Sequence, residues 1–169
     1  MPGTTSGRLI EAALELFGAQ GFDAVSVTAI AARAGVTTGS LYHHFGHKGR
    51  LYDLVRSDVE RRVLDRVEGA AAMRTIRSTA DLAPALLVGF DYLVSSGYTR
   101  LFAETARHDA ENGQADDQLE QLVDRLLQGR RPAVGYLVLA AWSAALRRAG
   151  TSTQDAADAR AALAHLLAG

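Results

Sequence analysis

The stretch over residues 31–48, AARAGVTTGSLYHHFGHK, decides how this chain folds. It predicts the end of one helix, a turn at Gly35, a short helix over about 37–45 and a stop at Gly46. A helix of small residues, a glycine turn and a second helix that opens with hydroxyl side chains are typical of a helix-turn-helix. In that motif the second helix lies in the DNA major groove and reads base edges with its N-terminal residues. The stretch therefore indicates a DNA-binding unit.

The composition favours an all-helical protein. The chain has 169 residues and 18.0 kDa, which suits one domain or two small ones, and 48% of its residues are apolar. Aromatic residues make up only 7%, so alanine, leucine and valine must build the core. There is no cysteine, which excludes disulfides, zinc–thiolate sites and a thiol nucleophile. A chain without cysteine also suits the cytoplasm, where we expect it to act.

The charge of the chain gives no general attraction to nucleic acid. The net charge is −1, with eight basic against seven acidic residues over 1–66 and ten against twelve over 67–169. Any affinity for DNA must therefore come from the local placement of charge. The polar start, residues 1–7, predicts no signal peptide. The longest uncharged run, residues 132–146, is shorter than the ~20 residues of a membrane-spanning helix.

Apolar spacing and capping residues predict four helices in the first half, over 8–20, 27–34, 37–45 and 48–72. Ser26 is the expected N-cap of the second helix and His47 that of the fourth. The fourth helix, at about 30 Å, is long enough to connect two units rigidly. Its expected inward stripe is Leu51, Leu54, Val55, Val59, Val63 and Val67.

The second half also predicts helices, over 78–95, 99–110, about 116–129, 132–149 and 156–167. Ser78 with Asp81, and Ser152 with Asp155, have capping-box spacing. The expected fold is all-α: an N-terminal three-helix helix-turn-helix head is joined by a long fourth helix to a C-terminal helical bundle that dimerises. We expect residues 1–50 to be the head and 51–169 the effector-binding and dimerisation domain, with 48–72 as the connecting helix.

Residues 8–55 closely resemble the N-terminal domain of the TetR family of transcriptional regulators. The matching segments are ALELF over 13–17, GFDAVSVTAIA over 21–31, AGVTTGSLYHHF over 34–45 and K-x-x-L over 48–51. The resemblance implies a DNA-binding head and a variable helical domain that dimerises and often binds a small molecule, which lowers DNA affinity. By position, it implies DNA contacts at Thr28, Thr37, Thr38, Gly39, Ser40, Tyr42, His43, His44 and Lys48.

The chemistry of these side chains refines their expected roles. Tyr42 and His44 can donate hydrogen bonds to phosphate oxygens, and Lys48 places an ammonium group at a helix N-terminus, where anions bind. Thr28 either contacts the DNA backbone or caps its own helix. The recognition helix has no Arg, Lys, Asn or Gln before Lys48, so the strongest base readers are missing. Specificity would then rest on hydroxyls, thymine methyl contacts, His43 and DNA shape.

His43, His44 and His47 are close enough in sequence to suggest a metal site. Gly46 ends the helix between them and no carboxylate is nearby in sequence, so we expect no metal and no cofactor.

Two further surfaces are expected in the C-terminal half. An apolar effector pocket is predicted at Phe90, Tyr98, Phe102, Tyr136 and Trp142, with Met73, Glu104 and His108 as further lining candidates. The last two helices offer more apolar surface than one small domain needs, so a four-helix bundle between two copies is expected. The predicted interface comprises Val134, Leu137, Val138, Ala141, Ala145, Leu163, Leu166 and Leu167.

These observations favour a homodimeric repressor that a small-molecule effector releases from a pseudo-palindromic operator in double-stranded DNA. One alternative is a dimeric interaction protein whose head no longer binds DNA. A helical enzyme is a further alternative, but its only acid–base cluster is His108, Asp109 and Glu111, with no nucleophile placed beside it.

Overall fold

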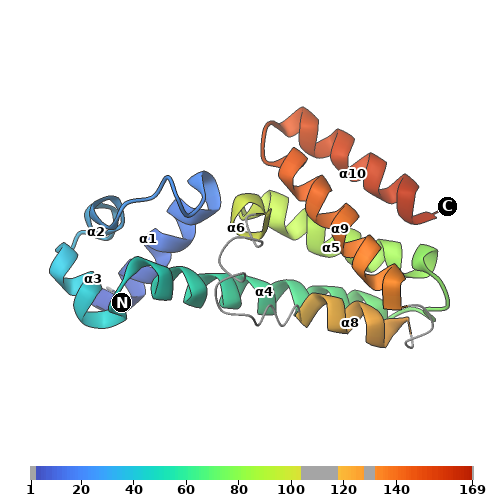
Figure 1. The fold of residues 1–169 in the computed structure, drawn as a ribbon, viewed down its shortest axis with the longest axis horizontal. Helices are drawn as coiled ribbons and strands as arrows, with labels where there is room; N and C mark the ends of the chain where they lie inside the picture. Colours follow the sequence, from blue (N-terminus) through green and yellow to red (C-terminus); the bar gives the residue numbers. More distant parts are fainter. Residues whose placement is uncertain (1–2, 104–117, 128–131, 169) are drawn as a thin grey trace.

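The computed structural model of the chain describes residues 3–103, 118–127 and 132–168, and all regular structure within these ranges is α-helical. The molecule is elongated, with the N-terminal helices at one end and the C-terminal helices at the other (Figure 1). The long helix α4 (Lys48–Ala72) runs beneath both ends and connects them. None of the described helices is long and apolar enough to cross a membrane.

The head consists of α1 (Thr5–Gln20), α2 (Val27–Ala34) and α3 (Thr38–Phe45). Ser26 caps α2, as predicted, by accepting the Ala29 N–H at 3.0 Å. Gly35 has φ 65°, a left-handed conformation that favours glycine, so it makes the turn between α2 and α3. The side chains that hold the three helices together are fully buried: Leu9, Ala13, Phe17, Ile30 and Leu41.

Helix α4 begins and ends where the sequence predicts. His47 caps it, with Nδ1 accepting the Arg50 N–H at 3.2 Å. The predicted inward stripe is confirmed except at Leu54, which is 43% exposed. Tyr52 is buried instead, because its ring packs edge-on against Phe17 at 5.1 Å. This contact ties α4 to α1.

The C-terminal helices surround the second half of α4. They are α5 (Thr79–Ser95), α6 (Thr99–Ala103), α8 (Gln118–Leu126), α9 (Pro132–Ala149) and α10 (Thr153–Ala168). The capping box of Ser78 and Asp81 is confirmed, and Ser152 caps α10 by accepting the Asp155 N–H at 3.0 Å. The predicted helix end over 104–110 and the pocket candidates Glu104 and His108 lie outside the described residues.

One continuous hydrophobic core runs from the head into the C-terminal domain. Gly89 lets α5 approach α4 closely, since a Cβ there would lie 2.9 Å from Val67. At the head, α1 rests on the α5–α6 turn, where a Cβ on Gly18 would lie 2.6 Å from the Gly97 carbonyl oxygen. Any side chain at Gly18 would therefore push the head away from this turn.

The predicted pocket residues do not gather around one space. Phe90 and Trp142 are fully buried, and the Trp142 indole N–H donates to the Leu86 carbonyl at 3.1 Å. Phe102 packs edge-on against Trp142, with ring centroids 5.7 Å apart. The prediction is wrong for Tyr136, which lies on the outer face of α9 and is mostly exposed.

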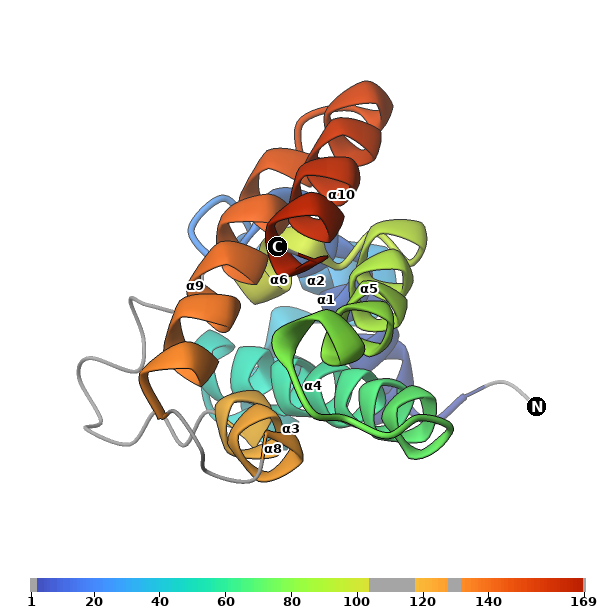
Figure 2. The same cartoon turned by 90° about the vertical axis from the view of Figure 1, so that its right-hand side faces the viewer.

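The predicted interface residues divide between the subunit's own core and its surface. The prediction is wrong for Val138, Leu163 and Leu167, which are buried within the chain because α10 packs on α9 and α5. Leu137 and Leu166 are 62% and 63% exposed on α9 and α10, which lie side by side in Figure 2. The remaining three are half-buried against the core: Val134, Ala141 and Ala145.

Candidate nucleic-acid interface

Helix α3 stands on the outside of the head with only one face attached to it. Leu41 and Phe45, four residues apart, are its two buried side chains. The helical period therefore turns the intervening residues outward. Thr37, Thr38, Gly39, Tyr42, His43 and His44 are exposed, and Ser40 is half-buried.

The hydroxyls at the start of α3 are partly engaged in capping. Thr37 Oγ1 accepts the Ser40 N–H at 3.2 Å and lies 3.0 Å from Ser40 Oγ. This pair closes the first turn of the helix. Each hydroxyl retains free bonding capacity toward solvent, since an oxygen with two lone pairs and one proton is not saturated by these contacts. Thr38 makes none of them and presents its side chain openly.

Tyr42, His43 and His44 form the polar ridge of α3. Tyr42 is 53% exposed, so its ring is not enclosed in the head's core. The His43 and His44 rings lie edge to face with centroids 5.2 Å apart. The ridge offers a phenol and two imidazoles, all able to donate to phosphate oxygens or base edges.

Lys48 points toward the protein in this structure. Its Nζ donates to the Phe22 and Val25 carbonyl oxygens, both at 2.9 Å, and lies 4.0 Å from the Phe22 ring centroid. The ammonium group therefore holds the α1–α2 loop against the start of α4. Sequence reasoning did not identify this role, because the two acceptors lie 26 and 23 residues away in the chain.

Around α3, exposed basic side chains supply local positive charge. Arg8 and Arg50 are exposed, and within the described ranges neither has an ion-pair partner. Arg33 is bound to Glu15 at 2.6 Å and is therefore compensated. Thr28 is exposed on α2, whose capping role belongs to Ser26.

The histidines do not form a metal site in the described part of the chain. His47 already uses Nδ1 to cap α4. Over residues 3–103, 118–127 and 132–168, no group of three His, Cys, Asp or Glu side chains has the arrangement that holds a metal ion.

Comparisons with known proteins agree with this geometry. The sequence model described as "Bacterial regulatory proteins, tetR family" matches residues 9–55, the head and the start of α4. The chain is similar to the HTH-type transcriptional regulator TtgW of Pseudomonas putida, with 31% identity over 135 residues, covering 73% of this chain and 90% of TtgW.

A second relative is longer than this chain. The HTH-type transcriptional regulator SrpR of Pseudomonas putida is also 31% identical over 135 residues, but the match spans 56% of its length, little more than half. Among solved structures, the fatty acid degradation regulator FadR from Bacillus halodurans has the same fold, with a TM-score of 0.75. It is 17% identical and the match covers 99% of this chain and 96% of that one.

Proposed function

Because the chain belongs to the tetR family of bacterial regulatory proteins, we propose that it is a homodimeric transcriptional repressor that a small-molecule effector releases from a pseudo-palindromic operator. Family members are regulators of transcription rather than enzymes, so the enzyme alternative is set aside. The regulator acts in the cytoplasm, where the DNA is.

The observation that carries the proposal is the exposed ridge of α3. A helix anchored only through Leu41 and Phe45 presents its remaining side chains to the major groove without any rearrangement of the head. Tyr42 and His44 contact phosphates, while Thr38, Gly39 and His43 face the bases. Arg8 and Arg50 add nonspecific attraction to the backbone.

A second copy of the chain covers the outer face of α9 and α10, hereafter the bundle face. Leu137 and Leu166 supply its large apolar side chains, and alanines on both helices permit close helix packing. Tyr136, predicted for the pocket, belongs to this face. Two heads related by a dyad then present α3 to successive major grooves, about 34–36 Å apart.

The functional division of the chain falls inside α4. Residues 1–50 bind DNA and residues 51–169 dimerise and bind the effector. The effector binds in the C-terminal domain near Phe102 and Trp142, whose rings are in contact there, and Phe90 is buried in the same core. An effector there that moves α4 changes the separation of the heads, and such coupling is worth about 1–3 kcal/mol.

The alternative is a dimeric helical protein whose head does not bind DNA, and the lack of basic base readers on α3 favours it. Fluorescence anisotropy with the duplex upstream of the gene distinguishes the two. We expect salt-dependent binding, weakened about tenfold or more by Tyr42→Phe with His44→Ala. Arg74→Ala, an exposed side chain just after α4 and away from both α3 and the bundle face, is the control. An unchanged affinity and salt slope in the double variant would exclude α3 as the contact surface.

A further inference from the structure

A groove of about 430 Å³ lies where the head meets the C-terminal domain. We call it the junction groove. Its walls are the end of α1 at Gly18, the first residues of α6 at Thr99 and Arg100, and the α9–α10 turn at Gly150 and Thr151. These segments meet at the head-facing end of the C-terminal helices (Figure 1). A volume of this order takes a small organic ligand.

Thr99 lines the junction groove, and its hydroxyl has no hydrogen-bond partner among the described residues. Thr99 is only 7% exposed, and no hydrogen bond of its side chain occurs within the described residues. Its Oγ1 faces the backbone of Gly150, 3.2 Å from where a Cβ would stand. Because Thr99 is one of the lining residues, a ligand in the groove can reach its side chain.

Arg100 supplies a positive charge next to this hydroxyl, and no carboxylate of the described residues balances it. Its side chain is exposed and lines the groove, and no carboxylate of the described residues lies within ion-pair distance of it. A guanidinium group binds a carboxylate through two parallel hydrogen bonds. The remaining lining is small and largely apolar, with Ala19, Val94 and Ala156 as examples, so it fits an organic body better than a bare inorganic ion.

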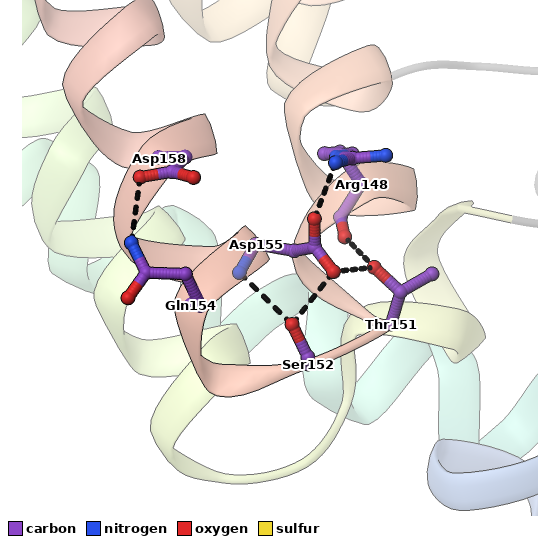
Figure 3. Close-up of polar contacts among 6 residues, drawn as sticks. All are labelled: Arg148, Thr151, Ser152, Gln154, Asp155 and Asp158. Atoms are coloured by element: carbon purple, nitrogen blue, oxygen red, sulfur yellow. Dashed lines mark hydrogen bonds and ion pairs between the residues drawn. The ribbon is translucent and has the colours of Figure 1, made fainter.

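The facing wall of the groove is held rigid, and its own charge is already balanced. Asp155 takes a hydrogen bond from Ser152 Oγ at 2.6 Å, lies 2.8 Å from Thr151 Oγ1 and pairs with Arg148 at 2.5 Å (Figure 3). The hydrogen bonds from Ser152 and Thr151 and the charge of Arg148 lower the pKa of this carboxyl. Arg148 pairs with Asp155, and Arg100 is the basic residue among those that line the groove.

We propose that the junction groove binds a small organic carboxylate, with Arg100 pairing with the carboxylate and Thr99 donating its hydroxyl to it. The site is separate from the effector pocket proposed near Trp142. Its occupant touches both α1 of the head and the α9–α10 turn of the C-terminal domain. Binding therefore stabilises the docked arrangement of the two parts, and the stabilisation grows with the logarithm of ligand concentration above the Kd.

Calorimetric titration of the full chain with benzoate, in the absence of DNA, tests the site. We expect saturable binding of one benzoate per chain at a Kd of about 1 mM or tighter. Benzamide has the same shape without the charge, and its binding should be at least about tenfold weaker. Inorganic phosphate, an anion without an apolar body, should also bind more weakly than benzoate.

Three variants assign the binding to the groove. Arg100→Gln should weaken benzoate binding at least about tenfold, Thr99→Val a few-fold, and Gly150→Leu should block the groove. Arg125→Gln makes the same charge change on an exposed arginine of α8 and should leave the affinity unchanged.

No saturable benzoate binding, equal binding of benzamide, or full affinity in Arg100→Gln would each overturn the proposal. Because the titration contains no DNA, these results leave the proposed operator binding intact.

Discussion

The outer face of α3 and the bundle face of α9 and α10 differ in chemistry. The outer face of α3 carries hydroxyl, phenol and imidazole groups, whereas the bundle face of α9 and α10 carries leucine, tyrosine and alanine. Burying a polar ridge removes its hydrogen bonds to water, so binding is favourable only if the partner replaces them. Phosphates and base edges offer such hydrogen bonds. An apolar face gains about 25 cal/mol for each Å² that it buries. The difference indicates DNA for the first face and a second copy for the other.

The largest expected effect comes from charging the bundle face. Leu137→Glu with Leu166→Glu places four uncompensated carboxylates in a symmetric interface. We expect dimerisation to weaken by at least about a hundredfold, because burying an unpaired charge costs several kcal/mol. Sedimentation velocity measures the change.

Leu54→Glu is the matched control, since Leu54 is an exposed leucine of α4 outside this face. It should leave the dimer intact. A dimer that persists in the double variant would mean that another surface joins the subunits.

A smaller effect is expected for a leucine in the core beneath the bundle face. Leu163→Ala should lower the free energy of unfolding by about 2–4 kcal/mol, because Leu163 is 3% exposed and packs inside its own subunit. Urea unfolding at two protein concentrations gives the value. A loss of stability that depends on protein concentration would instead place Leu163 in the interface.

Much of the head could be read from the sequence because its helices are short and bounded by local signals. Ser26, Gly35 and His47 mark helix ends through contacts with residues three or four positions away. Such contacts depend only on local spacing.

The errors occurred where local spacing carries little information. Helix α9 is apolar on nearly every side, so its sequence could not separate the buried Val138 from the exposed Leu137. Lys48 was predicted to face phosphate, but its ammonium group binds carbonyl oxygens more than twenty residues away. Long-range acceptors of this kind have no sequence signal.

The inward geometry of Lys48 predicts an effect on the stability of the head. Lys48→Met removes the donor to two loop carbonyls, and the loss should be about 1–3 kcal/mol, the range for charged hydrogen bonds. Arg50→Met, two positions on and exposed, should change stability by about 0.5 kcal/mol or less. Hydrogen exchange of the α2 amides in the two variants tests this. Equal protection of the α2 amides in the two variants would mean that the hydrogen bonds of Lys48 do not stabilise the head.

The smallest expected effect concerns the residues that cap the helices, which differ between the head and the C-terminal domain. In the head, Thr4, Ser26 and Thr37 cap with neutral hydroxyls, whereas α5 and α10 also use Asp81 and Asp155. Hydrogen bonds from the Arg77 backbone and from Ser78 lower the pKa of Asp81 below its ordinary value of 3.8. Ser152 and Thr151 do the same for Asp155.

A lowered folded-state pKa means that each carboxylate stabilises the fold fully above its ordinary pKa. The contribution is lost as the pH falls through the lower folded value. Urea unfolding between about pH 2 and 6 should therefore show a shallower acid loss in Asp81→Asn with Asp155→Asn than in the wild type. Identical pH slopes would show that these caps do not respond to acid.

We propose that two copies of the chain, joined through α9 and α10, present two α3 helices to one duplex. Native mass spectrometry of the protein with the duplex upstream of its gene measures this stoichiometry. We expect two chains per duplex, and loss of the complex in the Leu137→Glu, Leu166→Glu variant. One chain per duplex, or a stable complex formed by that variant, would show that the bundle face does not join the two copies on DNA.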